Sequence, residues 1–246
     1  MTEATGILRG IVRRTAELNW QPSPVAGVWR KRLELAGAVE AGRVTSVVRF
    51  DPGARFPHHA HPDGEEILVL DGVFSDETGD YPAGSHLLNP DGTSHAPWSG
   101  PGCTLFVKLR QYPGADRPRL AIDTASAVWR PGPVEGSELL ALYRDPAPGE
   151  GFAGLIRMAP DCNWGRNIRP DGEEVFVVEG VLEDEYGRHG AGSWLRHWPG
   201  IAHRWQSPEG CLLYVKLGHL GRYDEGCRAP APSGKTISGR GREGTG

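Results

Sequence analysis

Short apolar runs recur along the chain and alternate with clusters of Gly, Pro and Asp. The clearest runs lie at 67–70, 104–109, 175–178 and 212–217. They are rich in β-branched and aromatic residues, which favours strands over helices. Turn-forming triplets of Pro, Asp and Gly lie between them, at 51–53, 62–64, 90–92 and 170–172. This pattern predicts an all-β protein of many short strands, arranged as a sandwich or barrel.

The same pattern occurs twice. PDGEEILVLDGV at 62–73 matches PDGEEVFVVEGV at 170–181, an offset of 108 residues, and the runs GCTLFVKL and GCLLYVKL share that offset. WQPSPVAG at 20–27 and WRPGPVEG at 129–136 differ by 109, so one single-residue gap accounts for the whole register. We therefore expect two tandem β-units. The expected boundaries are an N-terminal segment 1–19, a first domain 20–110, a linker 111–126, a second domain 127–222 and a disordered tail 223–246.

Composition narrows the function classes. A net charge of −4 over 246 residues gives no electrostatic case for nucleic acid, and the basic run Arg30-Lys31-Arg32 is interpreted as a solvated strand face. No apolar stretch approaches the ~20 residues of a membrane span, and no signal peptide is evident, so a cytoplasmic location is expected. The four cysteines, Cys103, Cys162, Cys211 and Cys227, contain no C-x-x-C pair and are expected to be structural thiols.

Histidines and carboxylates gather in PHHAHPDGEE, residues 57–66. His59 and His61 are two positions apart, so on a strand they share a face. A tight turn at 62–64 would bring Glu65 beside them, and His95 follows a second turn. Three imidazoles and one carboxylate suit Fe(II), Mn(II), Ni(II) or Zn(II), and four protein ligands leave positions open for a substrate.

Other residues nearby are given a structural role. His58 is out of phase with the histidine pair and is expected on the surface, and His86 is expected in packing at the core or rim. Glu66 points away from Glu65 on a regular strand, so the ligand role goes to Glu65. Trp98 is equally compatible with a pocket wall and with core packing. The sequence identifies no catalytic residue beyond the metal ligands.

The spacing resembles the two motifs of the cupin family. Gly53-x5-His59-x-His61-x3-Glu65-x6-Gly72 resembles the first motif, and Gly84-x5-Pro90-x-Gly92-x2-His95 the second, with Ser99 where many members carry Asn. The runs EEILVLDGVFSDETGDYPAG and GCTLFVKLRQ are similar to the ChrR-like cupins. The resemblance implies a bicupin of two jelly-roll barrels. It also implies a metal bound by His59, His61, Glu65 and His95.

The second unit has lost part of that set. At an offset of 108, Asn167 and Arg169 stand in place of His59 and His61, while Glu173 and His203 are kept. Arginine does not lose its proton in proteins and cannot ligate a cation. We therefore expect one metal per chain, in the first unit, and a metal-free second unit in which Arg169 pairs with Glu173. An anion or organic-acid pocket around Arg169 is the alternative.

Three functions remain in competition. The resemblance extends to dioxygenases that cleave dihydroxyacetophenones and acetylacetone, so the favoured hypothesis is an Fe(II) dioxygenase. It would cleave a C–C bond next to a carbonyl, with O2 and a small ketone, diketone or hydroxyaryl ketone as substrates. With Zn(II) or Ni(II), the alternative is an isomerase, cyclase or lyase acting on a carbonyl compound. The third hypothesis is a sensor or regulatory protein, as in ChrR-type anti-sigma factors. A homodimer is compatible with all three, and the sequence does not fix the oligomeric state.

Overall fold

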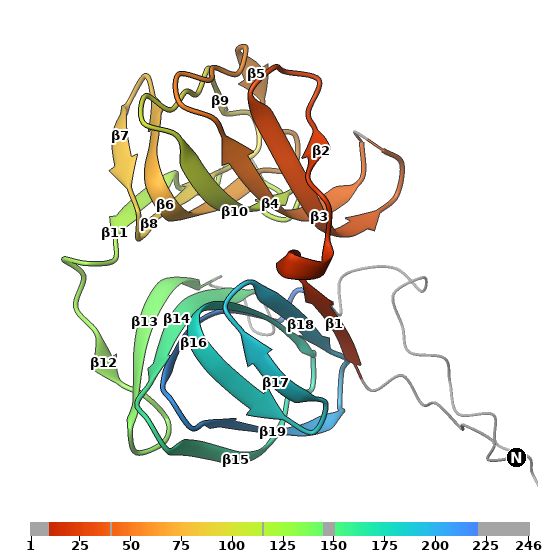
Figure 1. Ribbon diagram of the computed structural model, residues 1–246, viewed down its shortest axis with the longest axis vertical. Helices are drawn as coiled ribbons and strands as arrows, with labels where there is room; N and C mark the ends of the chain where they lie inside the picture. Colours follow the sequence, from red (N-terminus) through yellow and green to blue (C-terminus); the bar gives the residue numbers. More distant parts are fainter. Residues whose placement is uncertain (1–9, 40, 115, 145–150, 221–246) are drawn as a thin grey trace, which may run out of the picture.

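The computed structural model describes residues 10–39, 41–114, 116–144 and 151–220, which form two β-barrels stacked along the long axis of the molecule (Figure 1). The expected all-β fold with two tandem units is confirmed. The first barrel contains β2 (Gln21–Pro22), β3 (Val28–Ala36), β4 (Arg43–Phe50), β5 (His59–Ala60), β6 (Glu65–Asp76), β7 (Gly79–Pro82), β8 (Ser85–Asn89), β9 (Ser94–His95) and β10 (Cys103–Leu109). The second contains β12 (Arg130–Pro131), β13 (Ser137–Arg144), β14 (Phe152–Met158), β15 (Cys162–Ile168), β16 (Glu173–Asp184), β17 (Gly187–Gly190), β18 (Ser193–His197), β19 (Ala202–Ser207) and β20 (Cys211–Leu217). The expected tail 223–246 lies outside the described residues.

The two barrels repeat one sheet order. The main sheet of the first runs β8-β6-β10-β4-β3-β2, and that of the second runs β18-β16-β20-β14-β13-β12. Even the irregularities repeat: Gly72 and Gly180 both have φ +73°, and a Cβ on either would lie 2.0 Å from a backbone oxygen of the facing strand. Only glycine fits so close a backbone approach. Among the described residues, no helix is long and apolar enough to cross a membrane.

The barrels exchange one strand each. β1 (Gly10–Arg14) precedes the first barrel, yet it pairs with β18 of the second, with Val12 opposite Leu195. A single turn of 3-10 helix, Thr15–Glu17, leads from β1 back toward the first barrel. β11 (Leu120–Asp123), from the expected linker, pairs with β8 of the first barrel, with Ala121 opposite Leu87. The exchange therefore links the units through backbone hydrogen bonds, in addition to side-chain packing.

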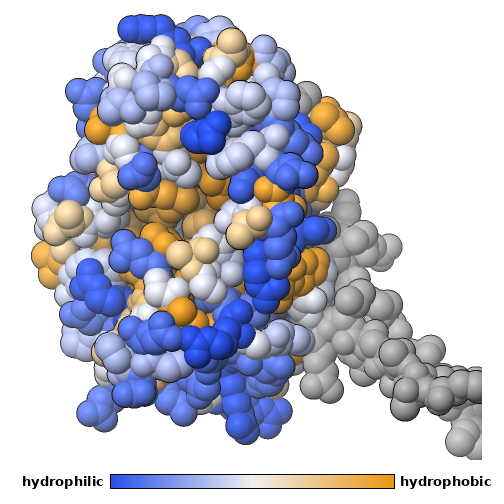
Figure 2. Space-filling model, in the orientation of Figure 1, coloured by the Kyte–Doolittle hydropathy of each residue, from blue (hydrophilic) through white to orange (hydrophobic). Residues whose placement is uncertain are grey.

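Strand alternation gives each central strand two buried faces. On β10, Leu105 and Val107 point into the first barrel, whereas Phe106 and Lys108 point to the second barrel. Phe106 stacks on Phe176 of β16, with ring centroids 4.4 Å apart. Figure 2 shows a largely hydrophilic face whose exposed hydrophobic surface is concentrated near the middle of the molecule, where the barrels meet.

Two buried ion pairs cross this interface in a reciprocal arrangement. Lys108 of the first barrel contacts Glu174 of the second, and Lys216 of the second donates to Glu66 of the first at 2.7 Å. Glu66 also accepts hydrogen bonds from Tyr214 at 2.7 Å and His86 at 3.0 Å. Burial alone would raise the pKa of Glu66, but the Lys216 ammonium and the His86 contact hold it well below its usual range. Burial would also raise the pKa of Glu174, but Lys108 and Arg196 hold it well below its usual range, so both glutamates are carboxylates inside the interface.

Replacing Lys108 with Ala tests this interface. The change removes a buried hydrogen bond to the Glu174 carboxylate, which keeps its contacts with Arg196 and His219, so the free energy of unfolding should fall by about 1.5–3 kcal/mol in urea denaturation. Arg157→Ala is the matched control because it breaks an exposed pair with Glu138, which should cost less than about 1 kcal/mol. Equal losses for the two variants would contradict a structural role for the buried pair.

Candidate metal centre

Two short strands and one turn bring the predicted ligands together. β5 and β9 form a separate two-stranded sheet in which His59 lies directly opposite His95. His61 follows β5, and Glu65 opens β6 after the turn. One donor atom from each of His59, His61, Glu65 and His95 lies within 4.8 Å of all the others, so the four side chains could hold a metal ion. The structure thus assembles the set that the sequence motif predicts.

The hydrogen bond made by Nδ1, the ring nitrogen that points away from the site, fixes the tautomer of each imidazole. The Nδ1 of His59 donates to the carbonyl of Pro57 at 3.0 Å. The Nδ1 of His61 lies 2.9 Å from the hydroxyl of Thr93, which itself donates to the carbonyl of Pro90. Because the hydroxyl proton of Thr93 is already used, His61 must be the donor. In both histidines, therefore, Nδ1 carries the proton and Nε2 carries a lone pair.

His95 also carries its proton on Nδ1, but there the hydrogen-bond partner is charged. Its Nδ1 lies 3.2 Å from Oδ2 of Asp76, and a carboxylate can only accept this hydrogen bond. Asp76 is fixed in turn by the guanidinium of Arg119 at 2.8 Å and by the backbone N–H of Thr78 at 2.8 Å. Such outer partners orient the imidazole ligands of metal sites and set their tautomers.

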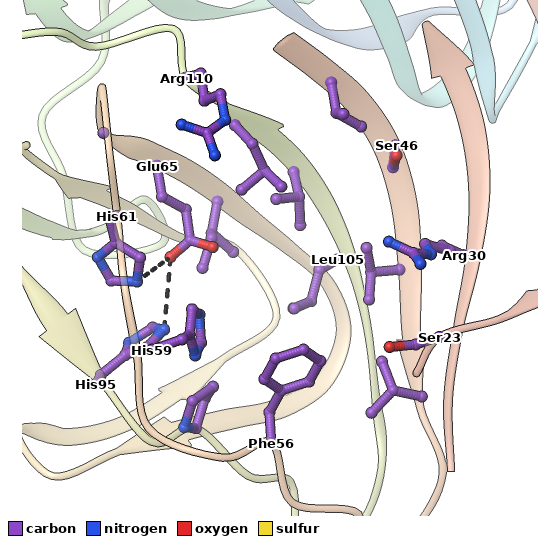
Figure 3. A pocket seen from close by; sticks show the side chains of 18 of the residues that line it. Ser23, Arg30, Ser46, Phe56, His59, His61, Glu65, His95, Leu105 and Arg110 are labelled. Carbon is purple, nitrogen blue, oxygen red and sulfur yellow. Dashed lines mark ion pairs between the residues drawn. The ribbon is translucent and has the colours of Figure 1, made fainter. Parts of the chain in front are cut away.

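The inner atoms of the site are acceptors that face one another. Oε2 of Glu65 lies 3.3 Å from Nε2 of His61 and 3.6 Å from Nε2 of His95 (Figure 3). The Nε2 of His61 is buried and has no hydrogen-bond partner. The only hydrogen bond to Glu65 in the described part of the chain comes from the amide of Asn89, at 3.1 Å. A buried group of lone pairs around a carboxylate fits a divalent metal ion, which would satisfy all four atoms together.

The ionisation of these groups reflects their burial. Desolvation, with smaller contributions from the charge that His95 and His59 would carry if protonated, lowers the pKa of His61 to about 3. Desolvation also raises the pKa of Glu65 to about 7 and lowers the pKa of His95. The enclosure thus resists a proton on His61 and a negative charge on Glu65. A bound cation would compensate the charge on Glu65.

Sequence reasoning missed the residues that surround the ligands. Asp76, Asn89 and Thr93 contact the ligands, and Arg119 holds Asp76 and Asn89, but these four residues meet only after folding. One signal was available: Asp184 stands 108 positions after Asp76, so both units keep this acid. Asp184 is also buried and accepts from His189 at 2.7 Å. A buried acid at the same position of both units indicates a residue with a structural role in each barrel.

A cavity of about 380 Å³ opens beside the ligands inside the first barrel. Its walls are mainly apolar and include Phe56, Phe50 and Leu105, while His59, His61, Glu65 and His95 line one side (Figure 3). The indole of Trp98 is not part of this lining. Arg30 and Arg32 also line the cavity, so the interpretation of these two residues as a solvated strand face is wrong. They alternate with Lys31, whose ammonium donates to the carbonyl of Thr15 at 2.7 Å outside the barrel.

The remaining expectations about nearby residues are met where the structure describes them. His58 is exposed and lies outside the ligand group, and His86 is fully buried against Glu66. Cys103, Cys162 and Cys211 are free and buried, as structural thiols should be, and Cys227 lies outside the described residues.

The second barrel holds a different cluster at the equivalent place. The guanidinium of Arg169 lies 3.3 Å from Glu173, as expected from the sequence. Glu173, His197 and His203 also approach within 4.8 Å, close enough to hold a metal ion. The sequence comparison missed His197 because it occupies the position of Asn89, not that of a ligand.

The cluster in the second barrel already carries its own cations. His197 sits between the carboxylates of Glu173 at 3.1 Å and Asp184 at 3.5 Å. Burial would lower the pKa of His197, but Asp184 and Glu173 raise it to about 9. A protonated His197 and the Arg169 guanidinium therefore neutralise Glu173. In the second barrel, cations of the protein itself thus contact the carboxylate that corresponds to Glu65.

Comparison with solved structures supports the fold. A candidate dioxygenase from Nostoc punctiforme matches with a TM-score of 0.72 and 17% identity, over 87% of this chain and 85% of that one. An Escherichia coli pirin in complex with nickel(II) matches with a TM-score of 0.64 and 15% identity, over 85% and 98%. The oxalate decarboxylase of Lactobacillus farciminis, in a formate complex, matches with a TM-score of 0.62 and 12% identity, over 89% and 88%. At these identities the likeness concerns the fold.

The family is shown by the sequence itself. A search of curated proteins gives no match. The model of the ChrR cupin-like domain matches twice, over residues 8–113 and 117–221. The two matches cover nearly the whole chain, and each begins ahead of an exchanged strand, β1 or β11. The chain therefore belongs to the ChrR cupin-like family and contains two copies of its domain.

Proposed function

We propose that this protein is a metal-dependent dioxygenase that holds one Fe(II) through His59, His61, Glu65 and His95. Its substrate would be a small ketone, diketone or hydroxyaryl ketone, cleaved at a C–C bond next to the carbonyl. The observation that carries the proposal is the set of four clustered acceptor atoms, three of them on buried residues, that faces an apolar cavity. The fold neighbour from Nostoc punctiforme, itself described as a candidate dioxygenase, is consistent with this activity.

Iron in this site would polarise the carbonyl oxygen and supply the redox chemistry with O2. Three neutral imidazoles and one carboxylate leave an Fe(II) site with a net charge of about +1, which favours an enolate or phenolate oxygen as the next ligand. The substrate itself supplies the electrons, and both oxygen atoms end in the products. This balance needs no separate electron donor.

The protein's own residues prepare this chemistry. Thr93, Asp76 and the carbonyl of Pro57 keep the three imidazoles in the tautomer that presents Nε2 to the centre. The apolar walls, including Phe56 and Leu105, exclude water from the reacting carbonyl. The cavity volume of about 380 Å³ lies at the small end of the range of about 300–1,000 Å³ for ligand pockets.

Metal analysis of anaerobically purified protein tests the centre. We expect about one transition metal per chain, and replacement of His59, His61 or His95 by Ala should each abolish occupancy, because one of four ligands is lost. His58→Ala and His203→Ala are the controls and should retain the metal. A stoichiometry near two, or loss of metal in the His203→Ala variant, would place metal in the second barrel instead.

Oxygen uptake tests the reaction. Iron-loaded protein should consume O2 only when a carbonyl compound that can enolise or chelate is present, because that donor must bind before O2 reacts. The panel contains β-diketones, hydroxyaryl ketones and keto acids, and the His95→Ala variant is the blank. If no compound stimulates uptake, while zinc-loaded protein converts a carbonyl compound without O2, an isomerase or cyclase replaces the dioxygenase.

A further inference from the structure

Apart from the metal ligands, five polar residues line the cavity of the first barrel at positions where the second barrel has no polar side chain: Ser23, Arg30, Arg32, Ser46 and Arg110. The paired strands define the equivalence: Arg30 is opposite Val48 on β3–β4 as Leu139 is opposite Ile156 on β13–β14. By the same registers, Arg32 corresponds to Ala141 and Ser46 to Gly154. Arg110, which follows β10, corresponds to Gly218, which follows β20. The polar residues occur only in the barrel that holds the four-ligand set.

Arg110 adopts a backbone conformation that is unusual for its residue type. Its φ of +59° lies in the left-handed region, where its counterpart Gly218 has +74°. Its backbone N–H donates to the carbonyl of Gly64 at 2.8 Å, so it is fixed against the turn that leads into Glu65. Non-glycine residues held in this region cost free energy and cluster at functional sites. The side chain, and not the backbone, therefore explains arginine at this position.

The Arg110 guanidinium is available for a ligand. Figure 3 shows it on the same side of the cavity as Glu65, with Arg30 and Ser46 on the facing strands. No hydrogen bond or ion pair engages the Arg110 side chain within the described part of the chain. The hydroxyl of Ser46, which is only 2% exposed, is likewise a buried atom without a hydrogen-bond partner. Two donors therefore line the cavity without an acceptor.

The charge of the lining favours an anion. Arg30, Arg32 and Arg110 contribute three positive charges, and Glu65 is the single acidic residue among the described lining residues. Glu65 belongs to the ligand set, where a metal would more than offset its charge. A planar guanidinium binds a carboxylate through two parallel hydrogen bonds, and the apolar walls strengthen that pairing by excluding water. A carboxylate ligand would supply the acceptor that the Arg110 guanidinium and the Ser46 hydroxyl lack.

We propose that the substrate is an organic acid: a carbonyl compound whose carbonyl end approaches the metal ligands and whose carboxylate is bound by Arg110. This inference deepens the proposed function and takes its metal site as given. The β3 arginines add positive potential, and Ser46 donates to a second oxygen of the same molecule. Arg110 is thus the residue that determines specificity for an acid over a neutral ketone.

Isothermal titration calorimetry on zinc-loaded protein separates binding from turnover. The probes are succinylacetone, a β-diketone with a terminal carboxylate, and its methyl ester. The wild type should bind the acid about tenfold or more tightly than the ester, because only the acid forms a charge-assisted pair with Arg110. Arg110→Gly and Arg110→Gln should both reduce this ratio to about one. Arg110→Gly removes the backbone strain, and Arg110→Gln retains most of the side-chain volume. A loss of the preference for the acid in both variants is therefore due to the loss of the charge.

Asp161→Gly is the matched control. Asp161 is another non-glycine residue in the left-handed region, at φ +61°, but it is exposed on the second barrel, and its counterpart Gly53 is already glycine. This variant should keep the wild-type preference for the acid. Equal affinity of the wild type for acid and ester, no saturable binding of the acid, or a preference that survives both Arg110 variants would overturn the proposal. A preference for the acid without oxygen uptake in the iron form would overturn only the dioxygenase reaction.

Discussion

Lys108 and Glu174 form a buried ion pair between the two barrels, and Lys216 and Glu66 form its counterpart. Removing four charged groups from water costs several kcal/mol per ion, which is recovered only if the groups meet in good geometry. An arrangement of the barrels that separated these groups would leave buried charges without their partners. Glu66 is also adjacent to Glu65, so the strand that is fixed at the interface by one glutamate presents the next to the metal ligands.

The two copies of the domain differ in how completely side chains fill their interiors. In the second barrel, Phe152 stands in place of Val44, Trp164 in place of Phe56 and Trp205 in place of Pro97. All three larger side chains belong to the core of that barrel or pack against it. The first barrel keeps smaller residues at these positions and has a cavity there. The second barrel is thus filled by its own side chains, while the first has room for a ligand.

The two copies also balance charge in different ways. In the second barrel, Arg169 and His197 neutralise Glu173 with protons that the protein already carries. In the first, each imidazole donates its Nδ1 proton to an outer partner, and the Nε2 atoms of His61 and His95 lie near Oε2 of Glu65. Acceptors alone cannot satisfy one another in a buried place. The same fold therefore encloses a network of ion pairs in one copy and, in the other, four side chains that could hold a metal ion.

Local sequence was sufficient for the strands, the duplication and the candidate ligand set. Strand periodicity, turn triplets and the spacing of His59, His61, Glu65 and His95 are properties of short segments, and so they can be read without a fold. The exchanged strands, the inward direction of Arg30 and the contact between His95 and Asp76 were decided by tertiary structure alone. A strand has two faces, and its sequence does not say which is enclosed by a barrel or which distant strand lies beside it. Those choices arise when the strands pair and the barrels pack, because only then is each face removed from water.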